Sequence, residues 1–229
     1  MNQGNELLKG IRFGLPVGLG YLPIAVAFGT LALQSGIGTK GTVLMSVLVY
    51  AGASQFMAVG MLVSGAGAMQ IIIATFFLNL RHLIMSMAVN RSIRTPSLVW
   101  KGLLSFGITD ETFALLSLEG QRQDRKISRL FTAGVMSIAY LSWVIGTILG
   151  GLGSRAIPAR ISDGMAIGLY AMFIGLLVPN VRRFPKTGAI ALLSMLLCYV
   201  FTRFLDQGWS IVLATVLGAT AGATIMGRK

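Results

Sequence analysis

Charged residues are scarce in this 229-residue sequence, where Asp, Glu, Lys and Arg together make up 11%, against roughly a quarter in a soluble domain. Apolar residues make up 55% and the mean hydropathy is +0.78. So many apolar side chains cannot all be buried in one modest core. The composition therefore excludes a disordered chain and an ordinary soluble enzyme, and it indicates a polytopic membrane protein.

The sequence has one cysteine, Cys198, which excludes an intrachain disulfide and a cysteine metal cluster. It also lacks the G-x-x-x-x-G-K-[ST] loop of ATP hydrolysis, the H-E-x-x-H zinc motif and the G-x-S-x-G nucleophile elbow. No nucleophile and base can be named together. We therefore predict a protein that is not an enzyme and that uses no cofactor or metal.

Acidic residues are fewer than basic ones, 7 against 19, which gives a net charge of +12. Because the basic residues punctuate apolar runs, they predict contact with the lipid bilayer and its headgroups, and no nucleic-acid partner. Counted over the alternate loops of eight helices, 11 basic residues lie on the side of the N-terminus and 7 on the other, with residues 91–101 opposite residues 122–129. This narrow excess places both termini in the cytoplasm. A single re-entrant segment would change the count.

Long apolar runs dominate the chain. Residues 13–39 contain no charge, and residues 41–80 contain none over 40 positions, enough for two crossings at about 20 residues each. Further runs follow at 83–90, 102–118, 130–154, 164–181, 187–202 and 207–226. Since a backbone in hydrocarbon must satisfy its own polar groups, we expect helices. The prediction is an all-α polytopic membrane protein, one integral transport domain over residues 1–229 with seven or eight transmembrane helices.

Pro16 and Pro23 lie in the first apolar run. Proline removes a backbone donor and clashes with the preceding turn, so we predict that the first helix is broken or kinked near mid-depth. The freed backbone groups would face either a substrate or ion, which makes Pro23 a candidate site residue, or neighbouring side chains in a packing kink.

Small residues recur at every fourth position in two runs, at 10, 14 and 18 and again at 214, 218 and 222. This spacing predicts close contacts between helices. In addition, residues 164–170 loosely match residues 14–21, which suggests a weak internal repeat, although chance similarity between glycine-rich helices explains it more simply.

Asp110 and Glu111 interrupt the apolar run at residues 103–118 near its centre. Insertion scales put a carboxylate there at roughly 3 kcal/mol, so the pair needs a partner or a cavity. Alternatively, Asp110 caps a short half-helix running to about residue 118, with Glu111 in its first turn.

Asn79, Arg81 and His82 lie inside a helix expected over about residues 70–90. Arg81 has a planar fork that can hold a carboxylate, either that of an acidic side chain or that of a substrate, or it reaches a headgroup from the helix end. His82 titrates near neutral pH and can pass protons, or it packs without a role. Cationic and anionic groups in an otherwise uncharged interior suit a zwitterionic ligand.

Tyr50 and Gln55 supply uncharged hydrogen-bonding groups in the second apolar run. They either line a substrate path or join helices through hydrogen bonds.

Four stretches, GYLPIAVAFG at 20–29, YAGASQF at 50–56, FLNLRH at 77–82 and TDE at 109–111, resemble in the same order the AzlC-type family, the large subunit of bacterial branched-chain amino acid exporters. The likeness runs from about residue 10 to 181. It implies a multi-pass protein of the bacterial inner (plasma) membrane that exports L-valine and related apolar amino acids with a small AzlD-type membrane subunit. It carries over no set of site residues.

From the residues themselves we hypothesise a secondary exporter in which Arg81 or half-helix amides hold the substrate carboxylate. Asp110 or Glu111 would hold its ammonium group or carry a proton in exchange. Two alternatives stay open: an uncoupled channel or transporter for small anions, and a membrane scaffold for a partner subunit that moves no solute.

Overall fold

The computed structural model describes residues 3–94, 97–122, 126–154 and 184–227, together with residues 158, 167, 174, 177, 178, 181 and 182. The described chain is all-α, as predicted, apart from one pair of two-residue strands. By internal contacts it divides into two compact units, a first unit of residues 1–55 and 80–166 and a second unit of residues 56–79 and 167–229. The single transport domain stays a prediction.

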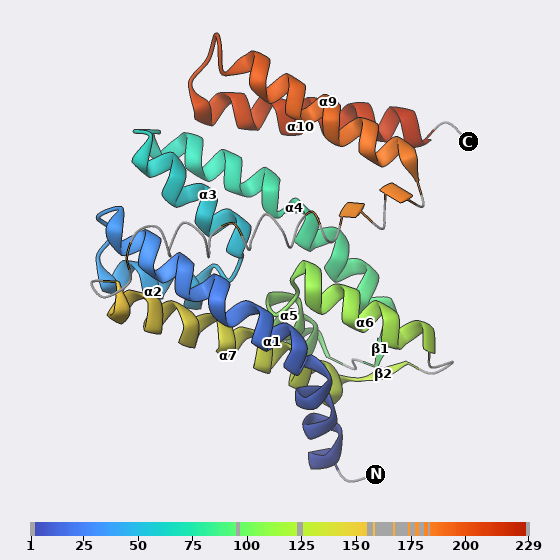
Figure 1. The fold of residues 1–229 in the computed structure, drawn as a ribbon. Coiled ribbons are helices and arrows are strands. Elements are labelled where there is room, and N and C mark those ends of the chain that lie inside the picture. The colour runs from blue at the N-terminus through green and yellow to red at the C-terminus, as the bar shows by residue number, and fades with distance from the viewer. Residues whose placement is uncertain are drawn as a thin grey trace. The chain divides into compact units, whose positions relative to one another are not determined.

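Two long helices, α1 (Gln3–Gln34) and α7 (Arg129–Gly153), lie along each other in the first unit (Figure 1). Glycines line the contact: Gly10 and Gly14 lie against the backbone of Phe131 and Val135, and Gly150 lies against Val26. A methyl group at Gly10 or Gly150 would overlap the backbone of the partner helix. The predicted contact face at residues 10, 14 and 18 is therefore confirmed.

The break predicted in the first helix is absent, because α1 runs as one helix through Pro16 and Pro23. Its N-terminal end, dark blue in Figure 1, bends away from the rest of the helix. Each proline costs one backbone hydrogen bond and a local clash. The long contact with α7 holds the helix on both sides of the prolines, so these losses bend the helix at most and do not end it.

The uncharged stretch of residues 41–80 does not form two complete crossings. It holds α2 (Thr39–Leu48), α3 (Gly52–Val63) and the first half of α4 (Ala68–Ser92). With 10 and 12 residues, α2 and α3 are each too short to span a bilayer, which takes about 20. They are separated at Tyr50, whose φ of 42° lies in the left-handed region and ends any helix. Hydropathy records where charge is missing, and it does not record where a helix stops.

Four short elements connect α4 to α7: β1 (Ile93–Arg94), α5 (Leu98–Phe106), α6 (Asp110–Arg122) and β2 (Ile127–Ser128). The two strands pair in parallel, with Ile93 opposite Ile127. The Arg129 guanidinium lies 5.2 Å from the ring centroid of Trp100, and Gly107 packs on Met136 two turns further along α7. From β1 the chain therefore runs through α5 along the first turns of α7. It then returns through α6 to the end of the unit where β1 lies.

This return corrects the count of basic residues by alternate loops. Residues 91–101 and 122–129 were expected on opposite sides, whereas the pairing of β1 with β2 brings the two segments together at one end of the first unit. The run at 102–118 thus folds back on itself, since its two helices, of 9 and 13 residues, begin and end at the same end of the unit. This hairpin predicts a re-entrant segment. Apolar side chains of α4, α5, α6 and α7 form one core cluster here, among them Val89, Leu104, Leu116 and Val135.

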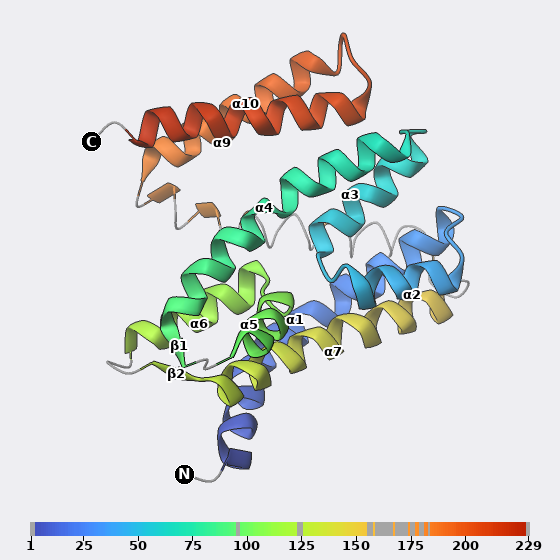
Figure 2. The same cartoon turned by 180° about the vertical axis from the view of Figure 1, so that it is seen from behind.

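The second unit contains α9 (Pro185–Phe201) and α10 (Gln207–Gly227), which lie side by side (Figure 2). Gly218 lies against Ser194 and Gly222 against Ile190, so the small-residue spacing predicted at 214, 218 and 222 marks a helix contact here too. The ends of α3 and α4 that belong to this unit contribute buried Met61 and Ala74 to a small apolar cluster with Val212 of α10.

Among the described residues, three helices are long and apolar enough to cross a membrane, at residues 4–34, 68–92 and 129–153. Shorter apolar helices accompany them at 52–63, 185–201 and 209–224. The run at 164–181, expected as a further crossing, and the repeat suggested at 164–170 fall outside the described residues except for a few isolated positions. The all-α membrane class is confirmed, and the count of seven or eight crossings stays a prediction.

Candidate functional site

The break between α5 and α6 places two carboxylates in the first turn of a helix. The Thr112 amide donates to Thr109 Oγ1 (3.3 Å) and the Thr109 amide donates to Thr112 Oγ1 (2.8 Å), which is the reciprocal arrangement of a capping box. Asp110 and Glu111 follow the cap, where the positive end of the helix dipole favours negative charge. The expected half-helix is present, but Thr109 and not Asp110 caps it, and it continues to Arg122.

Asp110 faces α4. Its Oδ2 accepts from Arg81 Nη1 at 2.9 Å, and the two side chains are 23% and 29% exposed. Arg81 therefore holds an acidic side chain of this protein, which was one of the partners predicted for it. The ion pair joins the last three turns of α4 to the first turn of α6.

Glu111 faces α1. The Tyr21 hydroxyl is hydrogen-bonded to Glu111 Oε2 and to Thr109 Oγ1, the latter at 2.6 Å. With a single proton, the phenol donates to one of these oxygens at a time. The other carboxyl oxygen, Glu111 Oε1, is buried and finds no hydrogen-bond partner among the described residues. A buried carboxyl oxygen without a partner is costly, so this atom marks a place where a proton or a donor fits.

Tyr50 brings the other helix break to the same place. Its side chain is 3% exposed, its hydroxyl has no hydrogen-bond partner within the described chain, and it lies within electrostatic reach of Glu111. The ring centroid is 4.9 Å from that of Tyr140 and 6.1 Å from that of Phe106, the last residue of α5. The break between α2 and α3 and the break between α5 and α6 therefore meet beside α7.

Gln55 holds helices together through both ends of its side-chain amide. Its Oε1 accepts from Trp143 Nε1 at 2.9 Å, and its Nε2 donates to Ser46 Oγ at 3.0 Å. Ser46 is in turn hydrogen-bonded to Thr147 at 2.7 Å. Of the two interpretations left open by the sequence, this geometry matches hydrogen bonding between α2, α3 and α7.

The remaining candidates are His82, Asn79 and Pro23. His82 is half-buried beside Arg81 and within electrostatic reach of Asp110. Asn79 falls in the second unit, and Pro23 is exposed on α1, two residues beyond buried Tyr21. The structure brings together Arg81, Asp110, Glu111, Tyr50 and, at the edge, His82.

Sequence reasoning did not select Tyr21, although it lies in the GYLPIAVAFG stretch at residues 20–29. Thr109 belongs to the TDE stretch at residues 109–111, but neither its cap nor its bond to Tyr21 is among the predictions from the sequence. A signal was present in each case. Tyr21 is a phenol in an apolar helix that needs a partner when buried, and T-x-x-T at residues 109–112 before an apolar run has the spacing of a helix cap.

Comparisons with known proteins cover this region. The family described as AzlC protein matches residues 16–157, which include every residue of the site. The chain is 34% identical to an uncharacterised membrane protein of Archaeoglobus fulgidus, over 82% of this chain and 84% of that one. It is 29% identical to the inner membrane protein YgaZ of Escherichia coli (77% and 74% covered) and 24% identical to the branched-chain amino acid transport protein AzlC of Bacillus subtilis (76% and 69%). No solved structure matches.

Proposed function

Because this chain belongs to the AzlC protein family, we propose that it transports branched-chain or other apolar L-amino acids, L-valine first among them, across a bacterial inner membrane. The name of the Bacillus subtilis relative supports the substrate class, and that of the Escherichia coli relative supports the membrane. We further propose that transport is export in exchange for protons, that a small AzlD-type membrane subunit takes part, and that both termini are cytoplasmic.

One observation carries the assignment of the site: Glu111 Oε1 and the Tyr50 hydroxyl are both buried without a hydrogen-bond partner in the described chain, at the meeting of two helix breaks. In transporters, interrupted helices expose backbone ends that bind substrates and ions at mid-membrane. An ammonium group has three donors and no acceptor, so it suits a carboxylate and a phenol oxygen. We therefore assign the ammonium group, or the exchanged proton, to Glu111.

Asp110 is assigned a different role from Glu111, since its carboxylate already holds Arg81. A substrate carboxylate that approached Arg81 would compete with Asp110 for the same fork. The ion pair is thus suited to open when substrate arrives and to close when it leaves. His82, half-buried beside the pair, is assigned to the path of the proton.

The same ion pair weakens the alternative of an uncoupled anion pathway. An anion-selective pore draws on fixed positive charge that is not neutralised nearby. In this structure the Arg81 guanidinium lies 2.9 Å from a carboxylate, and a second carboxylate follows at the next residue of α6. A zwitterion fits this balance of charge better than a simple anion does.

The test uses the full chain with its small subunit in lipid vesicles loaded with labelled valine. We expect wild-type efflux to follow a pH gradient, and we expect Glu111→Gln to lower it by at least about tenfold, as expected when a site loses a group that pairs with its substrate. Glu119→Gln, on the same helix, is the matched control. Undiminished efflux in Glu111→Gln would remove Glu111 from the mechanism.

Counterflow separates the two roles of Glu111. A carboxylate that only carries the proton is dispensable when valine exchanges for valine, so Glu111→Gln would then keep counterflow and lose the response to pH. A carboxylate that binds the ammonium group is needed in both assays, and both would fail. Wild-type vesicles that move no amino acid in either assay would contradict the proposed function itself.

A further inference from the structure

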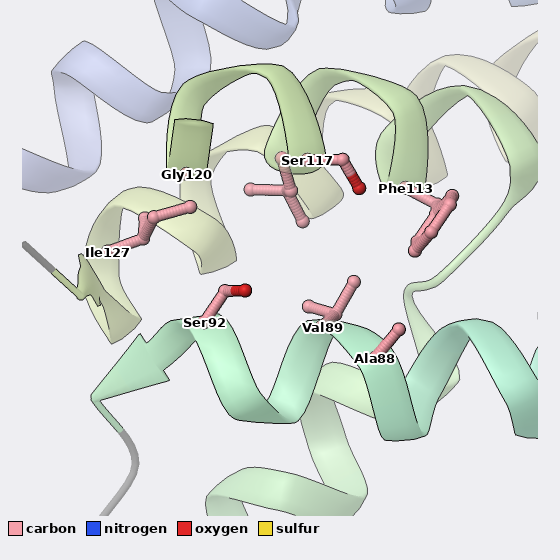
Figure 3. Close-up of a pocket in the computed structure, with 8 residues that line it drawn as sticks. Ala88, Val89, Ser92, Phe113, Ser117, Gly120 and Ile127 are labelled. Carbon is pink, nitrogen blue, oxygen red and sulfur yellow. The ribbon is translucent and has the colours of Figure 1, made fainter. Parts of the chain in front are cut away.

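A cavity of about 250 Å³ lies within the first unit, between α4 and α6 (Figure 3). Its walls are mainly apolar, with Ala88 and Val89 on α4 and Phe113 and Leu116 on α6. Two hydroxyl groups face into it from opposite walls, those of Ser92 and Ser117 (Figure 3). This volume falls just below the range of roughly 300–1,000 Å³ that drug-sized ligands occupy, so the cavity suits a smaller molecule.

The cavity lies on the same helix faces as the Arg81–Asp110 ion pair. On α6, positions 110, 113, 117 and 120 follow one another at helical spacing, and on α4 the same holds for 81, 85, 88 and 92. The two segments run in parallel, because Arg81 contacts Asp110 at one end and Ser92 approaches Gly120 at the other. The cavity therefore lies between the ion pair and the end of the unit at which β1 and β2 pair.

We propose that this cavity receives the apolar side chain of the amino acid on its way to the charged site. The inference rests on the proposed function and adds the place where side-chain size is selected. Alanine, valine, leucine and phenylalanine walls bury methyl and methylene groups favourably. The serine hydroxyls lie where the polar end of a small amino acid needs donors and acceptors.

The two hydroxyls also distinguish this occupant from a lipid tail. Ser92 and Ser117 line opposite walls of one small space. A hydrocarbon chain in that space would offer neither hydroxyl a hydrogen-bond partner. An amino acid satisfies them with its ammonium and carboxylate groups while its side chain contacts the apolar walls.

Gly120 offers a way to change the size of the cavity without disturbing the fold. A methyl group on Gly120 would lie 3.6 Å from Ile127 Cδ1 and 3.8 Å from Ser92 Cβ, which are ordinary van der Waals distances. Gly120→Ala therefore narrows the cavity, and Gly120→Val narrows it further. Gly102→Ala on α5 is the matched control, because a methyl group there meets nothing within 4 Å.

The experiment measures counterflow of alanine, valine, leucine and isoleucine by wild type and variants in vesicles. We expect Gly120→Ala to raise the KM for leucine and isoleucine by about tenfold relative to alanine, the effect of about one methylene in an apolar pocket. Gly102→Ala should leave the order of substrates unchanged. If wild type transports these amino acids and both Gly120 variants keep the same order, the pocket is overturned and the proposed function stands. If wild type transports none, the proposed function itself fails.

A labelling experiment decides the matter should the Gly120 variants fold poorly. Ser117→Cys changes only the hydroxyl to a thiol, and Cys198→Ser removes the one native cysteine. We expect leucine to slow reaction of the new thiol with a small thiosulfonate reagent by several-fold. Labelling that ignores leucine, or that follows only the acyl chain of the vesicle lipid, would overturn the proposal.

Discussion

At the scale of single residues, the sequence identifies the members of the site better than their partners. Arg81, Asp110 and Glu111 stand out because hydrocarbon penalises charge. The sequence leaves open which acid holds Arg81, because that depends on where α6 begins. Successive residues of a helix point about 100° apart, so a start at Asp110 turns this residue to α4 and Glu111 to α1. The sequence does not single out Tyr21, because burying a neutral phenol in hydrocarbon costs much less than burying a charge.

The Arg81–Asp110 pair gives a prediction at this scale. Asp110→Asn removes one charge and leaves Arg81 half-buried against a neutral amide. We expect the free energy of unfolding to fall by about 3 kcal/mol at most, the lower end of the range for breaking a buried ion pair, because both side chains are partly exposed. Arg81→Lys should also reduce transport, because an ammonium group lacks the planar fork. Thermal unfolding in detergent measures the first effect. The exchanged pair Arg81→Asp with Asp110→Arg should regain part of the stability, and equal stability of all variants would show that the pair contributes nothing.

At the scale of helices, contacts predicted from small residues are right, whereas the break predicted from proline is absent and the first helix only bends near its N-terminal end. Glycine spacing depends only on the surface that a helix presents, which the sequence determines. A break depends on whether neighbouring helices hold the chain, and α7 holds α1 through both prolines. The true breaks lie at residues 49–51 and 107–109, where Tyr50 and the Thr109 cap meet other parts of the fold.

The contact between α1 and α7 gives a prediction for two glycines of α1, one that faces α7 and one that does not. Gly29→Ala would place a methyl group against the Thr147 carbonyl, and we expect it to destabilise the protein by about 1–3 kcal/mol, as overpacking does. Gly20→Ala is the matched control on the same helix, since nothing lies within 4 Å of a methyl group there. Its higher helix propensity should make it neutral or stabilising. Melting temperatures that fall equally in both variants would contradict the assigned contact.

At the scale of the whole chain, the sequence predicts the class and misses the path. Low charge and high hydropathy fix a helical membrane protein, because hydrocarbon leaves the backbone few alternatives. Hydropathy alone gives no sign that residues 98–122 enter and return on one side, since a re-entrant segment is as apolar as a crossing. The return gathers basic residues at one end of the first unit: Lys9, Arg12, Arg91, Lys101, Lys126 and Arg129. By the positive-inside rule we predict that this end faces the cytoplasm.

The re-entrant path predicts which basic positions share a side of the membrane. With Cys198→Ser as background, we expect Lys101→Cys and Lys126→Cys to react from the same side, because α5 begins and α6 ends beside the β1–β2 pair. Lys40→Cys should react from the opposite side, since α1 separates it from the end that holds Lys9. An impermeant thiol reagent applied to intact cells and to inverted vesicles makes the measurement, and all three side chains replaced are exposed. If positions 101 and 126 react from opposite sides, α5 and α6 together cross the membrane. The basic residues at 91–101 and 122–129 would then lie on opposite sides of the membrane, as in the count by alternate loops. Their placement together at one end of the first unit would be wrong.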